Sequence, residues 1–222
     1  MTNKNIKSDL TNKCLILCGA IAGLLFTFSW IIQEAFRESY NPMMIPISSL
    51  AIGSLGWIQT LTFLITGTLI ILFAYGLWKM TKNEYNGVSK WGIILILVCA
   101  VGLIGAGCFT TDPMNGYPEG TPLVNDNPSF NSVMHQLFSS FLFFGLPIAC
   151  FIFANYFTVK KELKLMIFSS LSGILFLILF LLTSLGFSQL GGLQLYAGLL
   201  QRITLTIGFL WIFLISSYFF KK

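Results

Sequence analysis

Charge is what this chain has least of. Only 9 % of its 222 residues are Asp, Glu, Lys or Arg, whereas 55 % are hydrophobic and the mean hydropathy is +0.81. An ordinary soluble domain carries about 25 % charged residues. The deficit excludes a water-soluble globular domain and indicates a membrane protein. The aromatic share of 15 %, which includes 22 Phe, suits helices whose outer faces meet lipid.

Metal-binding and redox motifs are also missing. A single histidine, His135, excludes a multi-histidine metal site inside the membrane. The five cysteines contain no CxxC pair, and an odd number gives no disulfide framework, so we interpret them as small packing residues. The GxSxG nucleophile pattern is absent too. We therefore expect neither a bound metal nor a cofactor.

The basic residues form no compact patch of the kind that binds nucleic acid. The formal net charge is +5, but the Lys and Arg residues stand at the ends of apolar runs. The amino-terminal segment, two connections and the carboxy-terminal end hold eleven of the 13: Lys4, Lys7, Lys13, Lys79, Lys82, Lys90, Lys160, Lys161, Lys164, Lys221 and Lys222. Arg37 and Arg202 lie elsewhere. The positive-inside rule therefore predicts cytoplasmic termini, and no nucleic-acid partner is expected.

Six apolar runs are each long enough for a helix of about 20 residues, which crosses a hydrocarbon core about 30 Å thick. We expect an all-α, polytopic integral membrane bundle of six transmembrane helices, forming one domain over residues 1–222. The expected spans are 14–35, 57–78, 91–111, 131–157, 165–187 and 195–220. Gly102, Gly105 and Ala106 give the third span a small-residue face that allows close helix packing.

The segment between the first two spans is mixed in character. Pro42 and Pro46 disfavour one continuous helix there. The apolar residues around them are expected either to lie in the membrane interface or to fold back towards the core.

Polar side chains gather at the outer ends of five spans. Counted from the nearest cytoplasmic lysine, they stand 19 to 25 residues away, or about 30–38 Å along a helix: Glu34, Gln59, Asp112, His135 and Arg202. This shared depth predicts a polar site. Within the membrane Arg202 needs a partner, for which Asp112 or Glu34 is the natural choice. Alternatively, its guanidinium holds a phosphate or carboxylate of a ligand.

Each of these residues also has a structural interpretation. Arg202 can simply anchor the sixth span, and a lone histidine is often a hydrogen-bonded structural group. In the functional interpretation, His135 acts as an acid or base oriented by Asp112. Ser49 is a further candidate ligand-binding residue. Four serines are possible nucleophiles, but no nucleophile motif surrounds any of them: Ser48, Ser49, Ser139 and Ser140.

Short blocks of the sequence resemble a known family. They are Ile47-Ser48-Ser49-Leu50, Phe109-Thr110-Thr111-Asp112-Pro113, His135 at the start of the fourth span, and Gly198-Leu199-Leu200-Gln201-Arg202. With them the chain resembles the bacterial six-helix membrane family catalogued as domain of unknown function nine-nine-eight. The resemblance covers nearly the whole chain and implies a bundle similar in layout to DRAM- and Sfk-type membrane proteins, without established chemistry. That family usually has an acidic residue near Ser49, so the serine speaks against a metal role there.

The leading functional hypothesis is a binding protein or carrier. An outward-facing polar pocket would hold a lipid headgroup or small amphiphile through Arg202 and His135, and apolar walls would take its tail. Around them we expect Asp112, Glu34, Gln59 and Ser49. The surrounding partners are membrane lipids. The composition, rich in Lys, Asn, Ile and Phe, fits an AT-rich bacterium and hence a multi-pass protein of the plasma membrane.

Two alternatives remain open. The first is an intramembrane lipid hydrolase or transferase, with His135 as general base, Asp112 as its orienting carboxylate and Arg202 as the charge stabiliser. The second is a structural subunit that packs against a larger membrane partner. The sequence does not separate these functions.

Overall fold

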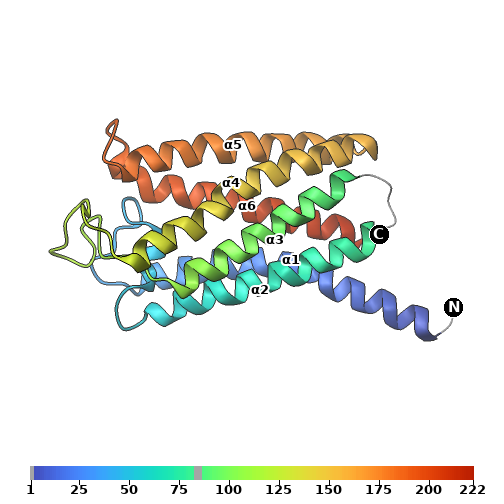
Figure 1. The fold of residues 1–222 in the computed structure, drawn as a ribbon, viewed down its shortest axis with the longest axis horizontal. Helices are drawn as coiled ribbons and strands as arrows, with labels where there is room; N and C mark the ends of the chain where they lie inside the picture. The colour runs from blue at the N-terminus through green and yellow to red at the C-terminus, as the bar shows by residue number, and fades with distance from the viewer. Residues whose placement is uncertain (1–2, 83–86) are drawn as a thin grey trace.

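The computed structural model describes residues 3–82 and 87–222, and over these ranges its regular structure is helical. The long helices pack side by side as a bundle (Figure 1): α1 (Asn3–Ala35), α2 (Gly56–Thr81), α3 (Gly87–Cys108), α4 (Phe130–Val159), α5 (Leu163–Phe187) and α6 (Ala197–Phe220). Two short 3₁₀ helices, η1 (Ile47–Ala51) and η2 (Leu193–Tyr196), lie in the connections. The expected all-α, six-helix fold is confirmed.

Every long helix has the length and composition to cross a membrane. Their apolar stretches run from 19 to 30 residues with a mean hydropathy of 1.9 or more. In α5 only 22 % of the most apolar stretch is buried inside the protein, so most of its Leu, Ile and Phe side chains face outward. An apolar exterior of this kind suits lipid and not water. The chain is a multi-pass membrane protein.

The bundle has two distinct ends. Figure 1 shows both termini and the turn between α4 and α5 at one end, called here the terminal end. Segments 36–55, 109–129 and 188–196 lie at the opposite end, called the loop end. All polar residues predicted to form a site belong to the helix ends or connections at this loop end.

Helix α3 ends at Cys108, three residues before the expected end of the third span. In a longer helix the Phe109 carbonyl would accept a hydrogen bond from residue 113, which is a proline without an N–H group. The side chain of His135 supplies the donor instead, at 2.8 Å from that oxygen. The proline therefore ends the helix, and a residue from α4 completes its last turn.

Segment 36–55 folds back into the bundle, which is the second of the two positions that we expected. Ile45, Ile47 and Leu50 are all buried. A Cβ atom at Gly198 would lie 2.6 Å from the carbonyl oxygens of Pro42 and Ile45. Only glycine lets the segment rest directly on the first turn of α6.

Helices α3 and α4 approach each other closely, as the small-residue face of the third span predicts. A Cβ atom at Gly102 would lie 2.6 Å from the Phe138 carbonyl oxygen, and one at Gly105 would collide with the Phe138 ring. This contact places His135 of α4 beside the end of α3.

Gly102→Ala is expected to destabilise the protein. In an unhindered helix this change stabilises by about 0.5–1 kcal/mol, but here the new methyl group meets a backbone oxygen, and overpacking costs about 1–3 kcal/mol. The midpoint of thermal unfolding in detergent should therefore fall. Val101→Ala, on the lipid-facing side of the same turn, is the control and should change stability by no more than about 0.5 kcal/mol. A more stable Gly102→Ala protein would contradict the close packing.

Candidate functional site

The guanidinium of Arg202 is buried, with a 6 % exposed side chain, and is held by partners from three parts of the chain. Its Nε lies 3.0 Å from the carboxylate of Glu34. Of the two partners expected for Arg202, Glu34 and Asp112, the structure therefore shows Glu34. Its Nη1 donates to the carbonyl oxygens of Ile45 (3.0 Å) and Gly198 (2.8 Å), and its Nη2 donates to the Tyr40 hydroxyl (2.7 Å). Arg202 thus ties α6 to α1 and to segment 36–55.

Tyr40 extends this cluster. Its hydroxyl donates to the Pro46 carbonyl oxygen at 3.0 Å. Burial raises the pKa of Tyr40 to about 12, although the neighbouring Arg202 acts in the opposite direction. The phenol is therefore protonated at neutral pH and serves as a hydrogen-bond donor. The Trp30 ring lies with its centre 5.4 Å from the Arg202 Cζ atom, which adds a cation–π contact.

Arg37 holds the other side of η1. Its two Nη atoms donate to the carbonyl oxygens of Leu50 (2.6 Å) and Ile52 (3.2 Å). Arg37 and Arg202, the two arginines outside the terminal end, therefore have the same structural role. Both donate hydrogen bonds to backbone oxygens of segment 36–55. Sequence reasoning assigned no role to Arg37.

Gln59 belongs to a polar seam between α1 and α2. Its Oε1 accepts a hydrogen bond from Gln33 Nε2 at 2.8 Å, and Gln33 also donates to the Ser29 hydroxyl, which contacts Thr62 at 2.6 Å. Ser49 of η1 is fully buried, and its hydroxyl has no hydrogen-bond partner among the described residues.

Asp112 closes the long loop between α3 and α4. Its carboxylate accepts hydrogen bonds from the Ser129 hydroxyl (2.6 Å), the Ser129 N–H (2.7 Å) and the Asn125 amide (2.9 Å). Ser129 in turn caps the first turn of α4 by accepting from the Ser132 N–H. The carboxylate therefore fixes the path of residues 112–129 and does not orient His135.

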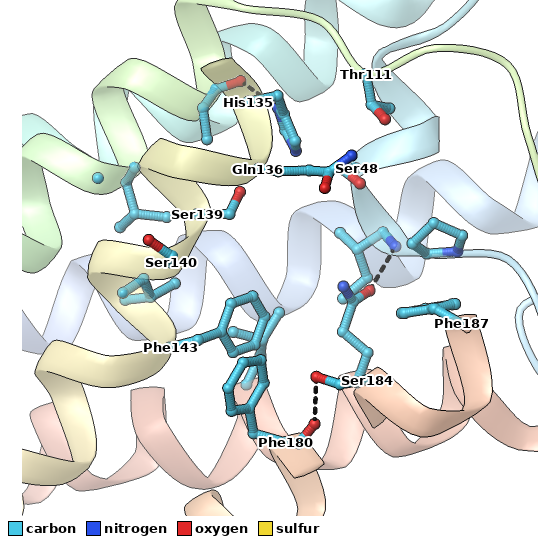
Figure 2. Close-up of a pocket in the computed structure, with 18 of the residues that line it drawn as sticks. Ser48, Thr111, His135, Gln136, Ser139, Ser140, Phe143, Phe180, Ser184 and Phe187 are labelled. Carbon is cyan, nitrogen blue, oxygen red and sulfur yellow. Dashed lines mark hydrogen bonds between the residues drawn. The ribbon is translucent and has the colours of Figure 1, made fainter. Parts of the chain in front are cut away.

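His135 is oriented by the backbone of α3. Its Nδ1 lies 2.9 Å from the Ala106 carbonyl oxygen and 2.8 Å from that of Phe109, and the residue is 4 % exposed. Because both partners can only accept, Nδ1 carries the proton in the neutral ring. Nε2 is then left with a free lone pair. Figure 2 shows the ring pointing into a cavity.

That cavity has a volume of about 580 Å³ and lies at the loop end, where all six long helices, η1 and the loop between α3 and α4 contribute to its lining. Its polar lining is Ser48, Thr111, Asn115, His135, Gln136, Ser139, Ser140, Ser184, Ser188 and Gln201, and its larger apolar lining includes Phe26, Phe63, Leu103, Leu142, Phe143, Phe180 and Leu205. Figure 2 shows Ser48, Thr111 and His135 on one side, with Phe143 and Phe180 on the other. The rings of Phe143 and Phe180 stack with their centres 4.7 Å apart.

Of the six residues predicted for the site, His135 alone lines this cavity. The other five do not line it: Glu34 and Arg202 form the ion pair and line a separate pocket of about 430 Å³, Gln59 lies in the seam, Asp112 closes the loop and Ser49 is buried in η1. Sequence reasoning missed Asn115, Gln136 and Gln201. Gln136 follows His135 in the chain and Gln201 precedes Arg202. This adjacency to predicted residues is the signal that could have found them. Asn115 comes from a loop whose path over the bundle has no sequence signature.

Gln201 connects the cavity wall to η1. Its Oε1 accepts a hydrogen bond from the Ile47 N–H at 2.8 Å, which is an unpaired donor at the start of the 3₁₀ helix. Ser48, the next residue, is thereby held at the cavity. Within the part of the chain that the structure describes, no three His, Cys, Asp or Glu side chains are grouped as metal ligands would be.

Glu34→Ala should destabilise the protein strongly. It leaves the buried guanidinium of Arg202 without its counter-charge, and breaking one side of a buried ion pair costs about 3–5 kcal/mol. The measurement is the thermal unfolding midpoint in detergent. Glu38→Ala, at an exposed position four residues later, is the matched control and should stay within about 0.5 kcal/mol of the parent. Equal midpoints for the two variants would show that the pair does not hold the loop end together.

Comparison with known protein families gives a match over most of the chain. The family model described as protein of unknown function (DUF998) matches residues 20–218. No curated protein and no solved structure matches the chain.

Proposed function

The chain belongs to the DUF998 family of proteins of unknown function, and we propose that it binds a small amphiphile in the cavity at its loop end. The observation that carries this proposal is the division of the cavity lining. Ser48, Thr111 and His135 lie on one side and the stacked rings of Phe143 and Phe180 on the other, while Ser184 stands beside Phe180 and Phe63 beside His135. This is the arrangement that suits a polar headgroup and an apolar tail.

The size of the cavity supports the proposal. A volume of about 580 Å³ falls within the range of roughly 300–1,000 Å³ of small-molecule sites. A cavity of this volume suits an amphiphile with a single acyl chain. The tail would contact the stacked rings of Phe143 and Phe180, and the head would reach Ser48 and His135.

The polar side of the cavity is also pre-organised. Arg202 and Arg37 hold segment 36–55 through its backbone oxygens, and Gln201 holds the first N–H of η1. Asp112 fixes the covering loop. A site whose groups are already positioned loses less conformational entropy when it binds. Arg202 thus acts as a support for the site and not as a ligand-binding group.

The proposal includes an orientation and a location. The excess of lysines at the terminal end favours a cytoplasmic position for both termini, by the positive-inside rule. The cavity then lies in the outer half of a bacterial plasma membrane. An amphiphile would enter it from the outer leaflet or the outer aqueous phase.

Ser139→Trp tests the binding function directly. Ser139 lines the cavity, and an indole there would occupy the space of the ligand. The protein is purified in detergent, and the lipids that remain bound are extracted and quantified by mass spectrometry. We expect retention to fall about tenfold or more, equivalent to 1.4 kcal/mol or more of lost affinity. Leu137→Trp, on the lipid-facing side of α4 at 48 % exposure, is the control and should retain the parent's lipids.

Two results would contradict amphiphile binding. One is equal retention by both tryptophan variants, which would assign the lipids to the outer surface. The other is a parent protein that retains no amphiphile, which would favour the structural-subunit alternative.

A second candidate function is hydrolysis of a lipid ester. The specific observation is that His135 turns Nε2 into the same cavity that Ser48 and Ser139 line. A free Nε2 lone pair is what a general base requires. Here the carbonyl oxygens of Ala106 and Phe109, and not Asp112, would fix the tautomer.

This candidate predicts release of oleate from monooleoylglycerol by the purified protein, and loss of that activity in His135→Gln. The glutamine amide retains an N–H donor for the end of α3 but cannot act as the base, so the rate should fall about 10²-fold or more. Thermal unfolding of the variant checks that it remains folded. Unchanged hydrolysis in folded His135→Gln would exclude this mechanism.

A further inference from the structure

We infer that the headgroup bound in the cavity is uncharged and carries hydroxyl groups, as in a monoacylglycerol. This inference rests on the proposed amphiphile binding and specifies its ligand class. It departs from the sequence-based expectation, in which Arg202 would hold an anionic head.

The cavity lining carries no formal charge when the ring of His135 is neutral. Among the described residues that line it, none is Asp, Glu, Lys or Arg. Arg202, the residue expected from the sequence to hold an anionic head, does not line the cavity and already donates to Glu34, Tyr40 and two backbone oxygens. Asp112 accepts three hydrogen bonds from its own loop. A charged headgroup would thus enter a site without a counter-charge, and the desolvation of an unpaired charge is costly.

Two groups at the cavity call for a hydroxyl. Asn115 is 6 % exposed, and its amide nitrogen is a buried donor without a partner among the described residues. His135 offers the opposite character, because Nδ1 bears the proton and Nε2 is an acceptor. A hydroxyl group both donates and accepts, so vicinal hydroxyls can satisfy the two. An ionised phosphate only accepts, and would leave Nε2 of the neutral ring unmatched.

The net charge of the loop end also disfavours an anionic headgroup. Five carboxylates, Glu34, Glu38, Asp112, Glu119 and Asp126, stand there against the two guanidinium groups of Arg37 and Arg202. This formal excess of three negative charges opposes the approach of an anionic amphiphile.

The experiment is a competition assay with labelled monooleoylglycerol on the purified full-length protein in detergent. Unlabelled monooleoylglycerol is compared with oleoyl lysophosphatidic acid, which adds one phosphate to the same glycerol and chain. Methyl oleate, which lacks hydroxyls, and oleylamine, which is cationic, complete the set. We expect monooleoylglycerol to compete at least about tenfold more strongly than each of the others.

The outcomes separate this inference from the proposed function. If lysophosphatidic acid or oleylamine competes as well as monooleoylglycerol, the uncharged-head inference is overturned while amphiphile binding stands. Equal competition by methyl oleate would show that the hydroxyls are not recognised. If the label binds equally to the parent and to Ser139→Trp, the cavity itself is not the site and both proposals fail.

Variants at the polar side add a second test. Asn115→Gly removes the unpartnered donor and keeps a residue suited to the left-handed backbone at φ 57°, so monooleoylglycerol affinity should fall about two- to tenfold. Gln136→Lys adds a positive charge at the cavity and should shift the competition towards lysophosphatidic acid. Asn131→Lys, exposed on the same helix away from the cavity, should not. Unchanged affinity in Asn115→Gly, or equal shifts for both lysine variants, would count against the assignment.

Discussion

The loop end of this bundle depends on the ion pair between Arg202 and Glu34. In a hydrocarbon surrounding each polar group needs a partner within the protein, and a guanidinium brings five N–H donors to be satisfied. Arg202 makes four such bonds: to α1 through Glu34, to segment 36–55 through Tyr40 and Ile45, and to its own helix through Gly198. The position of η1 follows from these bonds, and so does the position of Ser48 at the cavity wall. One charged residue of α6 therefore organises the end of α1 and the segment that follows it, which lie 157 to 168 residues away in the chain.

The same requirement explains the double use of His135. Pro113 removes the N–H that would have served the Phe109 carbonyl, so the end of α3 needs a donor from elsewhere. Nδ1 of His135 provides it across the close α3–α4 contact that Gly102 permits. Satisfying the backbone also determines the tautomer and aims Nε2 at the cavity. A structural bond and a ligand-facing lone pair thus belong to one side chain, so the structural and functional interpretations of the histidine are compatible.

The sequence predicts the fold class well and the site only in part. Long apolar runs and the scarcity of charge are local signals, and they suffice for six helices. The need of Arg202 for a carboxylate is equally clear from its position. Choosing Glu34 over Asp112 depends on which helices are neighbours, and α1 packs against α6. Depth along a helix is a single coordinate, so residues at the same depth can lie on different sides of the bundle. Gln59 and His135 share it, yet one lies in the α1–α2 seam and the other at the cavity. Contacts to backbone oxygens, as for Arg37, leave no pattern in the sequence.

What the cavity can recognise follows from what the rest of the loop end has already bound. Arg202 donates four hydrogen bonds to the chain and Asp112 accepts three from it, so both charged groups belong to the framework around the cavity and neither lines it. The polar groups that remain at the wall are neutral, and Asn115 keeps a buried donor without a partner in the described chain. A framework arginine is hard to recruit for a ligand, since each bond it gave up would release a segment of the site. The stability of the loop end and the neutrality of the cavity therefore have one physical origin.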